Sequence, residues 1–245
     1  MNYLAMRLGL LLVPAVVAWS VQSAPAAASE SVEALLRDLQ STNWDTRLHA
    51  VEELAYNKSS ASIVPLIAAL RDTAMRGVCE STHEEVPRDF RQYVTLPKGH
   101  SLPKYLCERI TFALGNISNL AQEPELKELK SALEDKDPFI RERVAFAVAY
   151  ARLKDPQILA ILGKAMRDRD YPVIAGAYLH YVRQGKSGTE ENLIAALEKF
   201  GYGVMAWNMR SCGNSKIVAA SPKWAEARGI SFPSMGSGLT WGKDE

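Results

Sequence analysis

The sequence predicts an all-α fold made of stacked pairs of helices, and three observations lead to this prediction. Apolar residues recur at the 3.6-residue spacing of helices in successive short segments. Several segments start at a helix-capping residue, as at Asp137-Pro138 and Asp155-Pro156. Toward the C-terminus, the first helices of successive pairs are spaced about 31–33 residues apart. This regular pairing predicts an α-solenoid, because stacked pairs can share a core that one pair cannot form alone.

The period assigns each expected helix to a first or a second position within its pair. The first helices are expected near residues 30–40, 62–72, 125–134, 156–167 and 189–200. The second helices are expected near residues 44–56, 103–120, 138–152 and 171–183. When the second helices are aligned, the cap position is held by Asn43, Asp137 and Asp170, and Arg47 aligns with Arg141.

Two segments, "DPFIRERVAFAVA" and "KYLCERITFALGNI", carry a resemblance to a known family. They resemble the D-x-x-V-R-x-x-A-A-x-A-L-G pattern of bacterial HEAT repeats, and the likeness extends over roughly residues 30–200. The resemblance implies a right-handed α-solenoid of helical hairpins whose second helices line a concave surface. The arginine of the pattern is present as Arg47 and Arg141, but Cys107 and Ile174 replace it in the other two units. A polar ladder along the second helices is therefore expected to be interrupted twice.

The N-terminal residues 1–28 have the features of a secretory signal peptide. Arg7 precedes an uncharged apolar run of about a dozen residues, and Ala24-Pro25-Ala26 and Ala26-Ala27-Ala28 fit small-residue cleavage sites. The run is too short to span a bilayer comfortably, and no later run is apolar enough to cross one. We therefore expect an exported protein, periplasmic or secreted, without membrane insertion.

The remaining chain divides into a solenoid at residues 29–229 and a tail at residues 230–245. The solenoid is expected to end in a cap at about 204–229, where "WNMRSCGNSKIVAASPKWAEARG" resembles the closing segment of some secreted HEAT-repeat proteins. Pro222 is expected to kink or restart the last helix, with Ser221 as the new N-cap. The tail is rich in Gly and Ser, and we expect it to be flexible.

One repeat contains an insertion at about residues 74–102. Arg47 and Cys107, at equivalent positions, are about 26 residues further apart than Cys107 and Arg141. Cys79 and Cys107 bracket the insertion, and in an oxidising compartment a disulfide between them would attach it to a helix. Two reduced cysteines, or a bridge to Cys212, remain alternatives. In the chain-entropy model such a bridge stabilises the fold by roughly 3–4 kcal/mol.

The side chains of the insertion favour contact with a partner over catalysis. His83, followed by two glutamates, does not begin the H-E-x-x-H pattern of a helical metal pair, because Pro87 stands at the fourth position after it. We therefore expect neither a metal site nor a catalytic group. Aromatic and arginine side chains commonly anchor interfaces. The candidate contacts of this kind are Arg88, Phe90, Arg91, Tyr93 and Tyr105. A decoration that only covers the edge of the solenoid is the alternative.

Charge and motif content narrow the range of functions. The formal net charge is +1, which gives no basic excess to attract nucleic acid. We expect a non-enzymatic scaffold without cofactors that binds a protein or peptide on the concave second-helix surface. Arg47, Glu108 and Arg141 are candidate contacts on that surface, with help from the insertion. An enzyme or lyase-like subunit that acts on a bound partner is the alternative, and the sequence leaves the oligomeric state open.

Overall fold

The computed structural model describes residues 30–72, 102–232 and 236–243, in which helices are joined by turns and no strand occurs. The all-α prediction is therefore confirmed for this part of the chain. The expected signal peptide at 1–28 and the expected insertion at about 74–102, apart from Leu102, lie outside the described residues. Among the described helices, none is both long enough and apolar enough to cross a membrane.

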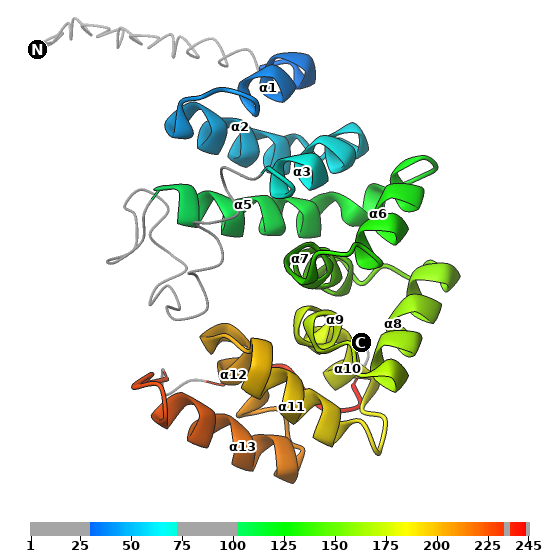
Figure 1. Ribbon diagram of the computed structural model, residues 1–245, viewed down its shortest axis with the longest axis vertical. Coiled ribbons are helices and arrows are strands. Elements are labelled where there is room, and N and C mark those ends of the chain that lie inside the picture. Colours follow the sequence, from blue (N-terminus) through cyan, green and yellow to red (C-terminus); the bar gives the residue numbers. More distant parts are fainter. Residues whose placement is uncertain (1–29, 73–101, 233–235, 244–245) are drawn as a thin grey trace, which may run out of the picture.

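Four helical pairs stack along the long axis of the molecule (Figure 1). Their first helices are α1 (Val32–Asp38), α3 (Ile63–Leu70), α6 (Glu125–Leu133) and α8 (Pro156–Asp168). Their second helices are α2 (Trp44–Asn57), α5 (Leu102–Ile117), α7 (Pro138–Tyr150), and α9 (Tyr171–Gly176) continued by α10 (Tyr178–Gln184). Short 3-10 turns precede α3 (η1, Ser60–Ser62) and follow α5 (η3, Ser118–Leu120). The second helices α2, α5, α7 and α9 pack on one another in sequence as one layer, and α3, α6 and α8 form another.

Within the stack, three of the four expected capping side chains make the cap bond. The side chains of Asn43, Asp137 and Asp155 accept hydrogen bonds from backbone N–H groups in the first turns of α2, α7 and α8. Asp170 holds the N-cap position of α9, as expected, but its side chain makes no such bond. Its carboxylate pairs with Arg141 instead.

The fourth second helix is broken, whereas the sequence predicted one helix over 171–183. The break follows Gly176, which lies against the backbone of α7. A Cβ atom on Gly176 would lie 2.0 Å from the carbonyl oxygen of Glu142. Ala177 then leaves helical geometry with φ −83° and ψ 17°, and the chain resumes as α10. Glycine therefore permits an approach between α7 and α9 that no other residue allows.

The C-terminal end changes the packing of the stack. It comprises α11 (Glu190–Phe200), α12 (Gly203–Met209) and α13 (Ser215–Glu226). Helix α11 packs mainly on α9 and α13 instead of extending the layer of α3, α6 and α8. Asn214 caps α13, which continues through Pro222 as one helix. The predicted restart at Ser221 is therefore wrong: the Ser221 hydroxyl donates to the Ala206 carbonyl and joins α13 to α12.

The described part of the tail is attached to the helices. Trp241 and Gly242 donate backbone hydrogen bonds to the carbonyls of Cys212 and Val182. Leu239 is 9% exposed and belongs to the core, which extends from Leu35 of α1. Residues 236–243 thus pack on the C-terminal end of the stack, where we had expected a loose segment.

Candidate interaction surface

An ion-paired seam follows the turns that connect first to second helices. Arg47 on α2 pairs with Asp72 at 2.8 Å, and its Nε donates to the Ser41 carbonyl. Arg141 on α7 repeats this arrangement: it pairs with Asp170 at 3.1 Å, and its Nη1 donates to the Asp135 carbonyl at 2.8 Å. The two arginine side chains are only 14% and 19% exposed. Each arginine therefore fastens its own turn and joins it to the turn of the next pair.

Arg71 connects the seam across the unit in which Cys107 replaces the arginine. It lies beside Asp72 and contacts Glu128 on α6 at 2.6 Å and Asp135 in the next turn at 3.0 Å. The ladder is interrupted on the helix, as the sequence predicted, but the seam continues through the turns. This role of Arg71 could not be predicted from the sequence, because the residue lies outside the repeat pattern.

The seam also lines a groove of about 270 Å³ between the turns. Its walls carry six charged residues. Two of the carboxylates, those of Asp135 and Asp170, already pair with Arg71 and Arg141 of the seam. The lining residues are Leu133, Glu134, Asp135, Arg141, Ile161, Lys164, Ala165, Asp168, Asp170 and Val173. Within the described ranges, no three His, Cys, Asp or Glu side chains gather closely enough to hold a metal ion.

The opposite end of the second helices carries aromatic side chains. Phe112 of α5 meets Phe146 and Tyr150 of α7 edge-on, with ring centroids 5.6 Å and 6.1 Å apart. Phe146 and Tyr150 stack at 5.8 Å. Gly115 makes room for this arrangement, because a Cβ atom there would lie 2.9 Å from the Tyr150 ring. Tyr150 nevertheless remains 43% exposed.

Tyr56 is a further exposed aromatic side chain, carried by α2 on the other side of α5 from α7. Glu52 pairs with Arg109 of α5 at 3.3 Å, so this side of α2 adjoins α5. Tyr56 lies four residues after Glu52, on the same side of the helix, and is 84% exposed. Its position on α2 is equivalent to that of Tyr150 on α7. We call Tyr56, Phe112, Phe146 and Tyr150 the aromatic face.

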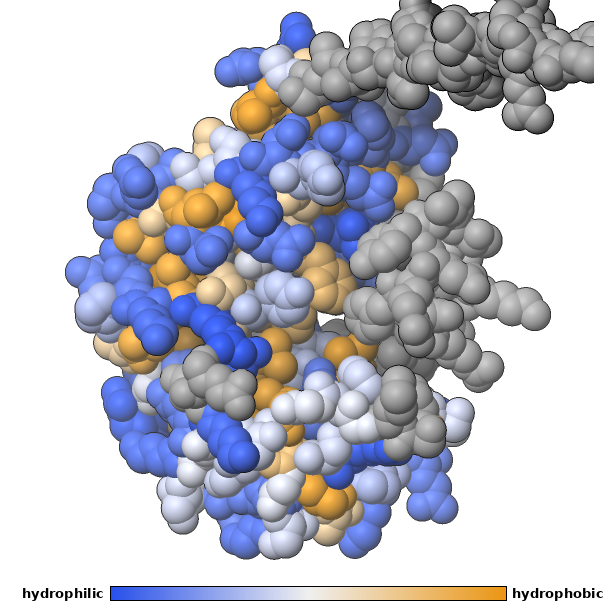
Figure 2. Space-filling model, turned by 180° about the vertical axis from the view of Figure 1, so that it is seen from behind, coloured by the Kyte–Doolittle hydropathy of each residue, from blue (hydrophilic) through white to orange (hydrophobic). Residues whose placement is uncertain are grey.

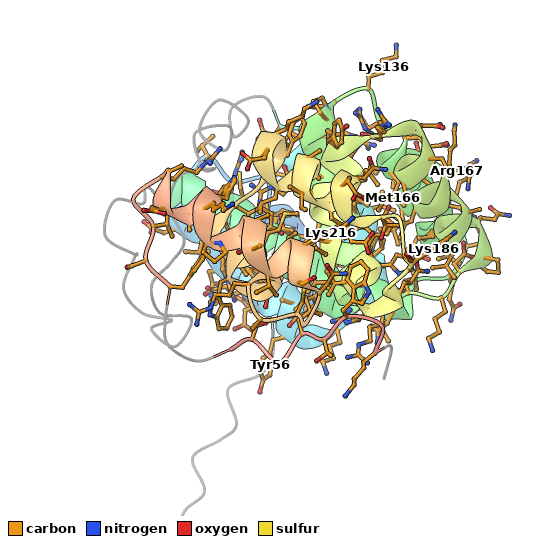
Figure 3. All side chains as sticks on the ribbon, turned by 90° about the horizontal axis from the view of Figure 1, so that it is seen from below. Tyr56, Lys136, Met166, Arg167, Lys186 and Lys216 are labelled. Atoms are coloured by element: carbon orange, nitrogen blue, oxygen red, sulfur yellow. The ribbon has the colours of Figure 1, made fainter. Side chains whose placement is uncertain are left out.

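The aromatic face and the seam lie on different sides of the molecule. Tyr56 projects from the side opposite Lys136, whose carbonyl accepts from Arg141 in the seam (Figure 3). Along α7, Arg141 and Tyr150 are nine residues apart, which corresponds to about 13 Å of helix. Figure 2 shows that apolar side chains on the rear of the molecule form patches among hydrophilic ones.

The structure distributes the sequence-predicted contact residues over different places. Arg47 and Arg141 lie in the seam, and Glu108 is half-buried on α5, where it takes part in contacts of its own. Tyr105 belongs to the first turn of α5, but its side chain is outside what the structure describes. Cys79, Arg88, Phe90, Arg91 and Tyr93 lie outside the described residues. The aromatic face was not predicted, although Phe146 and Tyr150 are four residues apart on one side of α7 and Phe112 holds the position on α5 that is equivalent to Phe146.

A buried polar cluster joins α10 to α12. The Tyr178 hydroxyl accepts from Asn208 Nδ2 at 2.5 Å, and the Tyr178 ring meets Tyr202 edge-on at 6.1 Å. Burial raises the pKa of Tyr178, and it raises the pKa of Tyr202 with a further contribution from nearby Tyr178 and Glu142. Both phenols therefore stay protonated at neutral pH, and their role is to hold the C-terminal end together.

Glu190 stabilises the turn before α11. Its carboxylate accepts from the Gly188 backbone N–H at 2.7 Å and from Asn214 Nδ2 at 3.3 Å. The backbone N–H of Glu190 itself, followed by that of Gly188, lowers the pKa of this carboxyl, outweighing burial, which raises it. The folded protein therefore binds a proton here less readily than the unfolded chain does.

Glu190→Gln is expected to lower the free energy of unfolding by about 1 kcal/mol at pH 7, because charge-assisted hydrogen bonds are lost. A carboxyl group whose pKa is lowered by folding stabilises the folded state when the pH is above its unfolded pKa of about 4.3. This stabilisation is lost as the pH falls through the pKa of the folded state. The difference between the two proteins should therefore shrink as the pH is lowered below about 4.3. Urea unfolding at several pH values measures it, with the exposed Glu226→Gln as control. A difference that is independent of pH would contradict this explanation.

No family model matches the chain, and no curated protein matches it. The function is therefore inferred from the geometry of these surfaces.

Proposed function

We propose that this protein is an exported, HEAT-like right-handed α-solenoid that binds a protein or peptide on its second-helix surface. The stacking of α2, α5, α7 and α9 in one layer supports the solenoid, and the aromatic face supports the binding role. The second-helix surface is the concave one in this proposal. The observation that supports the proposal most is that Tyr56 and Tyr150 stay 84% and 43% exposed at equivalent positions of α2 and α7, the two helices that flank α5.

The composition of the aromatic face favours a protein or peptide partner. Tyrosine offers a large apolar ring and a hydroxyl that can hydrogen-bond, and it is enriched at energetically important interface positions. Phe112 and Phe146 support Tyr150 from beneath, so a partner meets a ring that is already held in place. Asn116 lies exposed at the equivalent position of α5, between the two tyrosines. Its amide could bond a partner's backbone between two aromatic contacts.

The seam has a supporting role in this proposal. Arg47 and Arg141 fix the turns and hence the spacing of the helices that carry the aromatic face. The insertion at about 74–102 supplies a second contact through Arg88, Phe90, Arg91 and Tyr93, with Tyr105 at the start of α5. Both contacts together would allow the partner to be held from two sides.

Replacement of both exposed tyrosines is expected to weaken partner capture at least tenfold. Interface tyrosines often contribute 2 kcal/mol or more to binding, whereas exposed side chains contribute little to stability. Tyr56→Ser/Tyr150→Ser would be immobilised beside the native protein, and captured proteins from a native extract quantified by mass spectrometry. Val64→Ser on α3, where Val64 is 40% exposed, is the matched control. A third variant with residues 80–101 replaced by a short linker tests the insertion.

If the double variant captures the same proteins in the same amounts as the Val64→Ser control, the aromatic face is not the binding surface. If only the variant with the linker loses the partner, the insertion is the main binding contact, and the proposed role of the aromatic face is wrong. Circular dichroism of each variant checks that the helices are retained.

We further propose a Cys79–Cys107 disulfide that anchors the insertion to α5. Cys107 is buried and is not a free thiol, whereas Cys212 is free and buried. Burial raises the pKa of the Cys212 thiol, which disfavours the reactive thiolate. Alkylation without reductant is therefore expected to add no label to the native protein and one label, on Cys212, in denaturant. Three labels in denaturant would mean that the bridge is absent.

A further inference from the structure

The C-terminal segment 236–243 occupies a strip of surface formed by residues far from it in sequence. The strip lies between the end of α10 and the turn that joins α12 to α13. Its residues are Val182, Gly185, Asn208, Ser211 and Cys212, and we call them the docking strip. All of them contact the segment through backbone or short polar groups.

Two hydrogen bonds in the docking strip are made by the backbone alone, and Ser237 adds bonds to the Ser211 hydroxyl and the Asn208 carbonyl. Trp241 N–H donates to the Cys212 carbonyl at 2.7 Å, and Gly242 N–H donates to the Val182 carbonyl at 2.9 Å. Val182 belongs to the last turn of α10, whose carbonyls lack partners within the helix. Any extended segment could donate to these two acceptors, since neither bond requires a particular side chain.

Specificity for this segment comes from two apolar side chains and a glycine. Leu239 is 9% exposed, and Trp241 packs against the core. Gly185, with φ +58°, lies so close to the segment that a Cβ atom there would be 2.3 Å from Gly242 Cα. Gly242 itself has φ +70°, a conformation that β-branched residues strongly disfavour. The docking strip therefore selects a backbone with glycine at this point.

We propose that segment 236–243 is an intramolecular ligand and that the docking strip binds the same segment when a second copy of the chain supplies it. The contacts that hold the segment are noncovalent and few, so they resemble a peptide complex. A tethered segment competes at an effective concentration on the order of millimolar, which favours the intramolecular form in the native chain. Binding of the segment to the docking strip of a second copy becomes measurable only when each chain is prevented from binding its own segment.

Two full-length variants separate the strip from the segment. Gly185→Asn blocks the strip with a Cβ atom while its own segment remains intact, and asparagine tolerates positive φ, so α10 keeps its end. Gly242→Val prevents its own segment from docking, while its strip remains intact. Neither variant alone is expected to dimerise through the docking strip. A mixture is expected to form a one-to-one pair in which the segment of the Gly185→Asn chain occupies the strip of the Gly242→Val chain.

Sedimentation velocity of the mixture at concentrations on the order of 0.1–1 mM measures the pair. Hydrogen exchange of the Trp241 amide checks that the segment is released in each variant alone, with protection expected to fall at least tenfold. Adding Trp241→Ala to the Gly185→Asn chain should abolish the pair, which separates this contact from any other association. No pair despite released segments would overturn the proposal, and so would full protection of the Trp241 amide in either variant.

Discussion

Gly176→Ala is expected to lower the free energy of unfolding by about 3 kcal/mol or more, the largest effect of any single substitution considered. The new Cβ atom would lie 2.0 Å from the Glu142 carbonyl oxygen and 2.9 Å from its carbonyl carbon. Both contacts are with backbone, so no side chain can rotate away to relieve them. Helices α7 and α9 would have to separate, which would loosen the middle of the stack.

Gly163→Ala is the matched control for this substitution. Gly163 lies within α8, and a Cβ atom there would meet only the end of the Arg167 side chain, at 3.7 Å. Alanine is preferred over glycine in a helix interior by up to about 1 kcal/mol, so this variant should be slightly more stable than the native protein. Urea unfolding, monitored by the circular dichroism of the helices, compares the free energies of unfolding of the two variants. Equal stabilities of the two variants would mean that α7 and α9 are not in close backbone contact.

Arg141→Met is expected to cost about 2–3 kcal/mol, because it leaves the Asp170 carboxylate and the Asp135 carbonyl without their shared partner. Lysine should not restore the stability, since it cannot donate to both from a planar fork. Arg167→Met, an exposed change on α8, should alter the free energy of unfolding by less than about 1 kcal/mol.

A double-mutant cycle with Asp170→Asn measures the Arg141–Asp170 contact directly by urea unfolding. A coupling energy on the order of 1–3 kcal/mol is expected for residues in one network. Additive effects of the two substitutions would contradict the role of the seam in joining successive turns.

The helices could be predicted from sequence because their signals are local. Asn43, Asp137 and Asp155 cap the helices that they were expected to cap, since each bond involves neighbouring residues. The failures depend on contacts between elements. Asp170 resembles a cap in sequence, but its carboxylate is taken by Arg141, 29 residues earlier.

The candidate site was harder to predict for the same reason. Glu108 and Arg141 were chosen because they are charged and repeat-aligned, yet Arg141 serves the seam. The aromatic face depends on how α5 and α7 lie against each other, which permits Phe112 to meet Tyr150 above Gly115. Periodicity indicates which side of a helix is apolar. It does not indicate which rings remain exposed after packing.

Site-specific photo-crosslinking tests the central proposal, binding at the aromatic face, most directly. A photoreactive phenylalanine analogue would replace Tyr56 in one protein and the control residue Val64 in another, and each would be irradiated in a native extract. We expect position 56 to crosslink a defined protein that native protein competes away, and position 64 to give no such product. Crosslinking of the same protein from position 64 but not from position 56 would contradict the proposal.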